Sequence, residues 1–350
     1  MTALPRIKPV GPSPTDILII GDAPGGSEVL MNYPFVGSSG QELQKMCKEA
    51  GINYATTYRT YVSLSQPPKN DINYFTVPTK LATPPSRGLG MVSKGKYAND
   101  FLIDELARLH QEISAISPKV IIALGNLALW ALTGKTGIGA YRGVAEPYPP
   151  NPSITIIPTY HPAAVLRNWQ MRAIVVADLS KAARYLSKSE SPEPDEILSI
   201  KINPTLQEIA EFVPLAQSAK QMAIDVETKA SQIRTISFTI SPSSAFVVPF
   251  WDTDIGNYWK TDDEETLALT YVREILQSPA DKIFQNGAYD IQYIWKTWGI
   301  PIAGVIHDTM LLHHALQPEL QKSLGFLGSI YLDRAAWKQW RKEHAEKKDD

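Results

Sequence analysis

Short apolar runs alternate with longer amphipathic stretches along the first 190 residues of the chain. Apolar runs of four or five residues between turn residues are typical of buried strands, and an apolar period near 3.6 is typical of helices. The pattern predicts strands at Ile17–Ile20, Thr60–Ser63, Val120–Leu124 and Ile154–Pro158, and helices near Gln41–Ala50, Asn99–Ile116, Asn126–Thr133 and Ile174–Lys188. Because strands and helices alternate, we expect an α/β sheet that binds ligands at the carboxyl ends of its strands.

The second half of the chain shows the same alternation after a polar segment. Residues 187–204, SKSESPEPDEILSIKINP, begin as an acidic, proline-containing stretch that is typical of a linker. Beyond it, the pattern predicts strands at Met222–Val226, Thr235–Ile240 and Ser244–Val248 and helices near Glu264–Gln277 and Tyr289–Trp298. We therefore expect two domains, residues 1–190 and 205–350, joined by a linker at residues 191–204.

Composition narrows the class of protein. The chain has 350 residues, of which 44% are apolar and 20% charged, as in ordinary globular proteins. The single cysteine, Cys47, excludes a disulfide framework, a cysteine-based zinc site and a four-cysteine iron–sulfur cluster, and its helical context predicts a small buried side chain. The sequence has no secretory leader pattern and no apolar run that could span a membrane, so we expect a cytoplasmic protein of a bacterium or a phage-infected host.

Charge is unevenly divided over a chain whose formal net charge is −2. Basic residues are in excess over residues 1–190, and acidic residues are in excess over residues 191–350. A basic half suits a polyanion, whereas an acidic half suits metal ions or simply a solvated surface.

The segment from Gly21 to Gly40, GDAPGGSEVLMNYPFVGSSG, carries the first candidate site. It follows the first predicted strand, and its small residues allow the backbone to approach a ligand closely. Glu28 adds a carboxylate, and Phe35 adds an aromatic ring that can stack on a base. A loop with an acid and an aromatic ring at the end of a strand predicts a binding pocket.

A second candidate site follows the strand at Ile154–Pro158. His161 lies at this strand's end, where an imidazole can donate a hydrogen bond to a leaving group that gains negative charge. An isolated histidine there would more often be an ordinary loop residue. Its context favours the site, because it begins the segment HPAAVLR and follows VIIALGNLALWALTGKTGIGAYRG.

These segments resemble, in the same order, the motifs of family 4 uracil-DNA glycosylases: GEAPG with a later Glu and PFVG, a strand–helix–GKTG–RG segment, and an HPS-type motif followed by Arg. The resemblance covers roughly residues 15–186 and implies a three-layer α/β/α domain that flips uracil out of DNA and cleaves its glycosidic bond. It implies that His161 stabilises the leaving uracil, that Glu28 positions or activates water, and that Phe35 stacks on the base. It also implies that the pocket and the DNA are contacted by Gly21, Ala23, Pro24, Gly25 and Arg167, with Asp22 as a shorter acid where the family has Glu.

Three features depart from the family pattern. Tyr61 occupies the position of an Asn that is implied to read the uracil edge, and a phenol cannot reproduce the donor and acceptor of an amide. Ser65 occupies the position of a cluster cysteine, and the other cluster cysteines are absent, so we expect no iron–sulfur cluster. Residues Lys69–Tyr97 are expected to form a long loop, whose basic and aromatic residues suit either DNA contacts or a solvated insertion.

The second half carries an independent acidic pattern. Asp225 and Glu227 lie two apart on a predicted strand, so both carboxylates face one side, where a cation would relieve their repulsion. Asn286 and Asp290 follow later, where a predicted strand leads into a helix. Three convergent carboxylates suit two Mg²⁺ or Mn²⁺ ions, with Asp225, Glu227 and Asp290 as the ligands.

This DxE and NxxxD pair resembles the first two motifs of DEDD 3′–5′ exonucleases, in particular the proofreading domain of family A DNA polymerases. The resemblance implies a ribonuclease H-like α/β domain whose acids hold the metal ions and whose Asn286 helps to bind the substrate. We expect Asp308 to be a structural or helix-capping acid. The family's fourth acid, in a YxxxD or HxxxD pattern, has no good candidate in the sequence. We therefore expect this domain to be incomplete at its C-terminus, with a polymerase domain following in a longer polypeptide.

Together the two resemblances predict a DNA repair or replication protein. It would remove uracil or a related base from DNA, and its second domain would degrade DNA 3′ ends with Mg²⁺ or Mn²⁺. The expected partner is DNA, either single-stranded, uracil-containing or a primer 3′ end. The alternative is a non-catalytic module that senses a base at the N-terminus of a phage-type DNA polymerase, which Tyr61 and the missing fourth acid favour. A nucleotide-binding metabolic enzyme is disfavoured, because the sequence has no Walker or dinucleotide-binding fingerprint.

Overall fold

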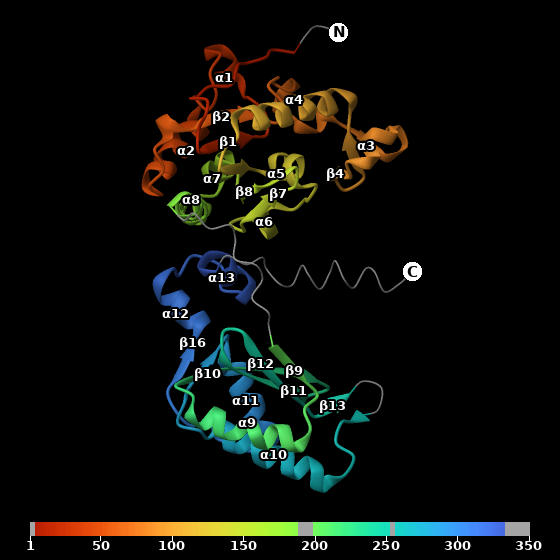
Figure 1. The fold of residues 1–350 in the computed structure, drawn as a ribbon, viewed down its shortest axis with the longest axis vertical. Coiled ribbons are helices and arrows are strands. Elements are labelled where there is room, and N and C mark those ends of the chain that lie inside the picture. Colours follow the sequence, from red (N-terminus) through yellow and green to blue (C-terminus); the bar gives the residue numbers. More distant parts are fainter. Residues whose placement is uncertain (1–3, 188–198, 253–255, 333–350) are drawn as a thin grey trace. The chain divides into compact units, whose positions relative to one another are not determined.

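The computed structural model describes residues 4–187, 199–252 and 256–332 (Figure 1). The chain divides into two compact units, one formed by Met1–Pro192 with Gly325–Asp350 and the other by Glu193–Leu324. Each unit has its own principal sheet and its own hydrophobic core.

The first unit contains a five-stranded sheet in the order β2-β1-β6-β8-β7. Four strands run parallel, and β7 pairs antiparallel with β8. Parallel pairing places the carboxyl ends of β1, β6 and β8 at one edge of the sheet, where ligands bind in folds of this kind. The strands are β1 (Ile17–Gly21), β2 (Tyr58–Tyr61), β6 (Val120–Leu124), β7 (Glu146–Tyr148) and β8 (Asn151–Thr159).

Helices cover both faces of this sheet. Along β1, Leu18 and Ile20 join the core beneath α4 and α5, whereas Ile17 and Ile19 join the core beneath α2 and α8. Because strand side chains alternate between faces, a strand whose residues are all buried needs a helical layer on each side. The expected three-layer α/β/α domain is confirmed. Its helices are α1 (Gly26–Met31), α2 (Ser38–Glu49), α4 (Asp100–Ile116), α5 (Asn126–Thr133), α6 (Ile138–Tyr141), α7 (Pro162–Arg167) and α8 (Met171–Ser187).

Residues 69–97 do not form the expected long loop. They contain a small antiparallel sheet in the order β3-β5-β4, a short helix and several turns, and the segment is anchored by Phe75 and Ala98, which are buried in the domain core. The Phe75 ring stacks on Phe101 with centroids 5.5 Å apart, so it cannot stack on a base, whereas Tyr74 is exposed. The elements are β3 (Thr76–Pro78), β4 (Met91–Ser93), β5 (Lys96–Ala98) and α3 (Pro84–Gly88), with 3₁₀ turns at Tyr54–Thr56, Pro68–Asn70, Ile72–Phe75 and Thr79–Leu81.

The second unit contains a six-stranded mixed sheet in the order β16-β15-β10-β11-β12-β9. It is packed against α9, α10 and α11 through one core, in agreement with the expected ribonuclease H-like α/β domain. Part of the expected linker, Ser199–Ile202, forms the edge strand β9. The other elements are β10 (Gln221–Lys229), β11 (Gln232–Ser241), β12 (Ser244–Pro249), β13 (Trp251–Asp252), β14 (Gly256–Asn257), β15 (Asp281–Phe284), β16 (Ile306–Asp308), α9 (Leu206–Ser218), α10 (Asp262–Leu276), α11 (Gly287–Trp298) and α12 (Thr309–Leu316).

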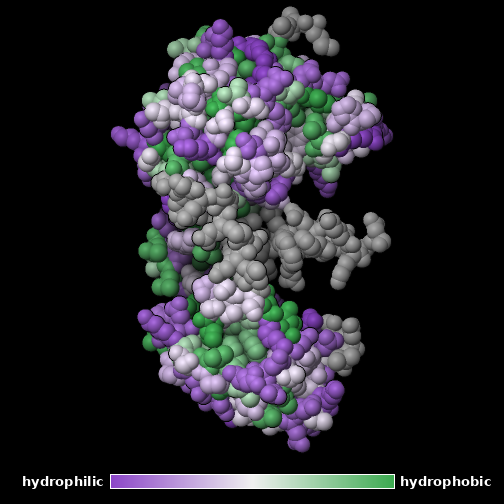
Figure 2. All heavy atoms as spheres, viewed as in Figure 1, coloured by the Kyte–Doolittle hydropathy of each residue, from purple (hydrophilic) through white to green (hydrophobic). Residues whose placement is uncertain are grey.

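Apolar side chains gather on the surface over α12, seen as green spheres at the left of Figure 2. Leu311, Leu312 and Leu316 are each more than half exposed. No helix within the described ranges is long and apolar enough to cross a lipid bilayer.

The first unit contains a buried cluster of charged side chains at the end of β8. Arg142 donates from Nε to Asp178 at 2.9 Å and from Nη1 to the Ser329 hydroxyl at 2.8 Å. Ser329 lies on α13 (Leu324–Tyr331), and Asp178 also accepts from the Thr159 hydroxyl at 2.7 Å. Lys181 is also buried and donates to three backbone carbonyls. Because buried ions require partners, this cluster fixes the end of β8.

Asp178→Ala should destabilise the protein strongly, because it leaves the buried Arg142 guanidinium without its carboxylate. The expected cost is about 3–5 kcal/mol, the usual cost of removing one partner of a buried pair. Urea unfolding of the full chain measures it. Asp16→Ala is the control, since Asp16 forms an exposed pair with Lys119 and such pairs contribute little. Equal midpoints for the two variants would contradict this account.

Candidate functional site

Asp22 lies directly after β1 and faces the start of α5. Its Oδ1 accepts a hydrogen bond from the Ala128 N–H at 3.0 Å. Gly125, which ends β6 with a φ of 99°, lies against the same carboxylate: a Cβ on Gly125 would be 2.8 Å from Oδ2. Only glycine provides both the left-handed backbone and the space. Burial raises the pKa of Asp22, and the nearby His161 opposes this shift.

His161 lies just beyond β8, as the N-cap of α7. Its Nδ1 accepts a hydrogen bond from the Ala163 N–H at 3.2 Å. A neutral imidazole that accepts at Nδ1 carries its proton on Nε2, which is therefore the donor. Burial lowers the pKa of His161, while the Asp22 carboxylate opposes this shift. The arrangement therefore favours a neutral imidazole with an Nε2–H to donate.

The sheet brings these two residues together across β6. Asp22 follows β1 and His161 follows β8, and β6 is the neighbour of both strands. Each residue shifts the pKa of the other, so the two side chains are within electrostatic reach. A carboxylate and a neutral hydrogen-bond donor at one strand edge can stabilise a cationic sugar and an anionic leaving group.

Glu28 is buried, and both of its carboxylate oxygens accept backbone hydrogen bonds. Oε2 accepts from the Gly25 N–H at 3.1 Å, and Oε1 accepts from the Gly37 N–H at 2.8 Å. These bonds join the two ends of the loop that carries Phe35. In the structure Glu28 therefore acts as an anchor of this loop.

Phe35 and Tyr61 form a buried aromatic pair. Their ring centroids are 4.6 Å apart with an interplanar angle of 26°. The Tyr61 hydroxyl oxygen accepts a hydrogen bond from the Phe35 N–H at 2.9 Å. Only 7% of Phe35 and 2% of Tyr61 is exposed. The ring expected to stack on a base thus stacks on Tyr61.

The other expected contact residues line the same loops. Gly21 ends β1 beneath the two rings, and Pro24 is buried while Ala23 is half-buried. Gly25 is the N-cap of α1 and donates to Glu28. Arg167 ends α7 with an exposed side chain and lies close enough to lower the pKa of His161.

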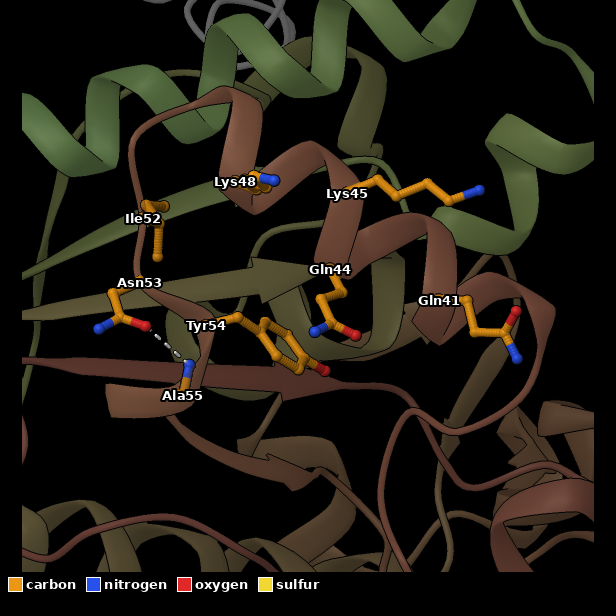
Figure 3. A pocket seen from close by; sticks show the side chains of 8 residues that line it. All are labelled: Gln41, Gln44, Lys45, Lys48, Ile52, Asn53, Tyr54 and Ala55. Carbon is orange, nitrogen blue, oxygen red and sulfur yellow. Dashed lines mark hydrogen bonds between the residues drawn. The ribbon is translucent and has the colours of Figure 1, made fainter.

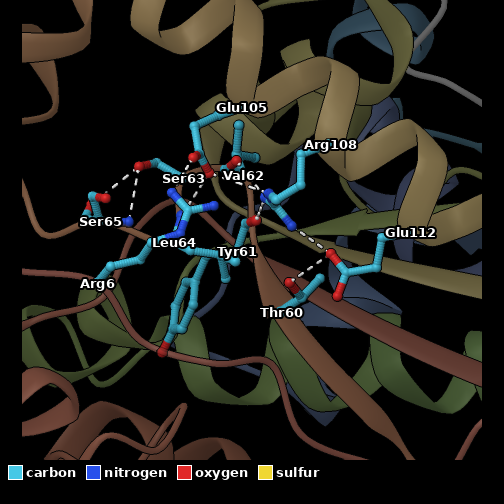
Figure 4. A network of polar contacts seen from close by, with 10 residues as sticks. All are labelled: Arg6, Thr60, Tyr61, Val62, Ser63, Leu64, Ser65, Glu105, Arg108 and Glu112. Carbon is cyan, nitrogen blue, oxygen red and sulfur yellow. Dashed lines mark hydrogen bonds and ion pairs between the residues drawn. The ribbon is translucent and has the colours of Figure 1, made fainter.

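The residues near Ser65 do not fit an iron–sulfur cluster. The Ser65 N–H donates to the Ser63 hydroxyl at 3.1 Å, and both residues are buried. Around them, Glu105 pairs with Arg6 and with Arg108 (Figure 4). Cluster ligation requires thiolates. The single cysteine, Cys47, is instead buried in α2, as predicted, and burial raises its pKa to about 12.

A separate surface pocket of about 450 Å³ lies between α2 and the 3₁₀ turn at Tyr54–Thr56 (Figure 3). None of the expected site residues lines it. The Tyr54 hydroxyl is buried and has no hydrogen-bond partner among the described residues. The lining residues are Gln41, Gln44, Lys45, Lys48, Ile52, Asn53, Tyr54 and Ala55.

In the second unit, Asp225 and Glu227 share the exposed face of β10. Their neighbours Ile224 and Val226 point into the core, so the expected alternation is confirmed. Asp290, on the first turn of α11, is buried, and its Oδ1 accepts from the Val226 N–H at 3.0 Å. Burial raises the pKa of Asp290 to about 6, and Asp225 and Asp308 add to the shift.

Asp308 is a structural acid, as expected. It is the N-cap of α12 and accepts from the Met310 N–H at 2.8 Å. It also accepts from the N–H groups of Asn286 and Gly287 at 3.1 and 2.8 Å. Asp308 thereby holds the turn that begins α11, where Asn286 is exposed with a φ of 62°.

The three expected metal ligands have the ligand atoms that a divalent cation prefers, since each supplies carboxylate oxygens. Burial raises the pKa of Asp225, and repulsion from Glu227 adds to this shift. Their arrangement fits such a cation less well. Within the described ranges no three His, Cys, Asp or Glu side chains lie close enough together to form a metal site. The residues beyond Leu332, where a fourth acid would be expected, lie outside the described residues.

Two contributions to the site were missed by the sequence analysis. Gly125 leaves room for the Asp22 carboxylate. The sequence feature that could have indicated this is a glycine directly after an apolar strand. Arg108 donates to the carbonyls of Tyr61 and Val62 at 2.7 and 2.8 Å and so holds the end of β2. An arginine on a helix face carries no sequence signal for such a contact.

Family models match both halves of the chain. Residues 8–186 match the uracil DNA glycosylase superfamily, and residues 200–348 match a 3′–5′ exonuclease family. Type-4 uracil-DNA glycosylases from Thermotoga maritima and Archaeoglobus fulgidus are 28% and 29% identical. These matches cover 50% and 52% of this chain and 79% and 82% of the relatives.

A DNA polymerase of Bacillus phage SP01 is 23% identical over 89% of this chain, which spans about a third (34%) of that polymerase. Among solved structures, the RRP6 catalytic core from Trypanosoma brucei matches with a TM-score of 0.33 and 15% identity over 42% of this chain and 39% of its own. Escherichia coli RNase D matches with a TM-score of 0.31 and 14% identity, over 39% and 34%. The chain therefore belongs to the uracil DNA glycosylase superfamily through residues 8–186, and its residues 200–348 are similar to a 3′–5′ exonuclease family.

Proposed function

We propose that the first domain excises uracil from DNA by hydrolysing its glycosidic bond, and that the second trims DNA 3′ ends. The observation that carries the first part is that Asp22 and His161 follow strands on either side of β6 and lie within electrostatic reach of each other at one edge of the sheet. Since the glycosidic bond is inaccessible in a stacked duplex, the uracil must be flipped out or lie in single-stranded DNA.

His161 would donate its Nε2–H to a uracil carbonyl oxygen as negative charge develops on the departing base. A neutral imidazole suits this step because the donor needs no proton from solvent. Asp22, held by the Ala128 N–H, would stabilise the cationic sugar and orient the attacking water. Glu28 would support both residues by fixing the loop, because its two oxygens are already engaged.

In the second domain, Asp225, Glu227 and Asp290 would hold Mg²⁺ or Mn²⁺. When bound, the metal supplies activated water and neutralises charge in phosphodiester hydrolysis. The exposed face of β10 presents two of the carboxylates, and the start of α11 presents the third. Asn286 is exposed beside them and would contact the DNA terminus.

A second function, base sensing without cleavage, is favoured by one observation. The Phe35 ring is covered by Tyr61, so the described state has no open stacking surface for a base. The phage relative is named a DNA polymerase, and we propose that both domains serve DNA synthesis in such a polypeptide. Uracil release distinguishes excision from sensing.

His161→Ala should slow uracil release by roughly 10²–10⁴-fold, the usual contribution of one positioned donor or acid–base group. The measurement is alkali cleavage of a uracil-containing single strand after incubation with the full chain in EDTA. The wild-type rate should not depend on divalent metal. If the folded wild-type protein binds this DNA but never produces abasic sites, the sensing function is the correct one.

Asp225→Asn should abolish Mn²⁺-dependent shortening of a 3′-labelled DNA strand, because it removes one carboxylate of the proposed metal site. Asp262→Asn, on the exposed first turn of α10, is the matched control and should behave like wild type. Shortening that survives in Asp225→Asn would show that these acids do not hold the metal.

Asp290→Asn should make stability less dependent on pH. Because the folded-state pKa of about 6 exceeds the ordinary 3.8, the protonated acid favours the folded state. Its stabilising contribution is complete below pH 3.8 and is lost as the pH rises to about 6. Thermal unfolding in EDTA should therefore give a Tm for Asp290→Asn above wild type at pH 7, with a smaller difference at acid pH. A difference that grows toward acid pH would refute the assignment.

A further inference from the structure

Tyr61 lies where a base bound by this domain would be expected to lie. Its ring covers the stacking face of Phe35, with centroids 4.6 Å apart. Gly21 lies against both rings, because a Cβ there would be 2.8 Å from the Tyr61 Cδ1 atom and 3.0 Å from the Phe35 Cζ atom. Because Gly21 has no side chain, it leaves a slot at the end of β1, and the Tyr61 ring fills this slot.

The Tyr61 hydroxyl also accepts the hydrogen bond of a backbone N–H group that faces this slot. The Phe35 N–H donates to the Tyr61 hydroxyl oxygen at 2.9 Å, and Phe35 has a φ of 56°. A buried N–H left without an acceptor is costly, so the phenol oxygen helps to hold this backbone conformation. Arg108 fixes the Tyr61 backbone by donating to its carbonyl at 2.7 Å. The side chain can therefore leave the slot only by rotating, because β2 itself is held.

We propose that Tyr61 is an internal mimic of the base, which any flipped base must displace, and that it thereby sets how tightly a base binds. This inference rests on the proposed function. A planar ring stacked on Phe35 and an oxygen that accepts from the Phe35 N–H are the two contacts that an entering base must replace. Uracil, with a carbonyl oxygen on each side of N3, can supply both. In cytosine an amino group replaces one of these oxygens, and this group would meet the N–H with a second donor.

The test measures binding by the full chain to single-stranded DNA with one 2′-fluoro-2′-deoxyuridine, whose glycosidic bond resists cleavage. The reference strand carries 2′-fluoro-2′-deoxycytidine at the same position. Fluorescence anisotropy gives both Kd values. Tyr61→Ala should lower both by roughly 10–100-fold, since neither base then competes with a stacked, hydrogen-bonded ring.

Two further variants keep the test decisive. Tyr61→Phe retains the ring but leaves the Phe35 N–H without its acceptor, so the ring is held less tightly and both Kd values should fall several-fold. Tyr54→Phe is the control, because it removes a buried hydroxyl that has no partner among the described residues and should leave both Kd values unchanged. If Tyr61→Ala does not fold, Tyr61→Phe decides the question.

Kd values that are the same in wild type, Tyr61→Ala and Tyr61→Phe would overturn the inference, because Tyr61 would then be an ordinary core residue. Uracil release from ordinary uracil DNA is measured in parallel. If the variants bind more tightly but none releases uracil, the mimic is supported and the excision proposal fails. If wild type releases uracil and no Tyr61 variant changes either Kd, excision stands and the mimic is refuted.

Discussion

The first domain depends on the convergence of three parallel strands at one edge of a sheet. β1 ends at Gly21, β6 ends beside Gly125 and β8 ends at Thr159, and the sheet order makes them neighbours. The proposed chemistry requires Asp22 and His161 to approach across β6. Gly125 makes this approach possible, since any side chain there would collide with the Asp22 carboxylate. The buried pair of Arg142 and Asp178 then holds the end of β8, from which His161 projects.

The two domains place their carboxylates in different electrostatic settings. Asp22 is half-buried, and although burial raises its pKa, the nearby His161 and the Ala128 N–H oppose this shift. The pKa values of Asp225 and Asp290 are raised by burial and by neighbouring acids, so their charge favours a cation from solution. The first setting suits metal-independent cleavage of a neutral bond. The second suits hydrolysis of a phosphodiester with divalent metal.

Sequence patterns predicted those parts of the structure that local periodicity controls. The apolar runs gave β6 and α5 with their observed bounds, and the alternation along β10 placed Asp225 and Glu227 on one face. The helices α1, α6 and α7 were not predicted, because four to six residues are too short to show a helical period. The loop predicted for residues 69–97 is wrong, because Phe75 is buried by contacts that the local sequence does not reveal. The pairing of Tyr61 with Phe35 joins residues far apart in the chain, so only the fold shows that the pocket is filled.

The most direct test of this account is the protonation state of His161 in the folded protein. Nitrogen-15 NMR of the histidine side chains, with His161 assigned by comparison with His161→Asn, distinguishes the two neutral tautomers from the imidazolium. The account predicts a neutral ring at pH 7 with its proton on Nε2, because Nδ1 accepts from the Ala163 N–H and burial lowers the pKa. A protonated ring, or a neutral ring with its proton on Nδ1, would contradict it.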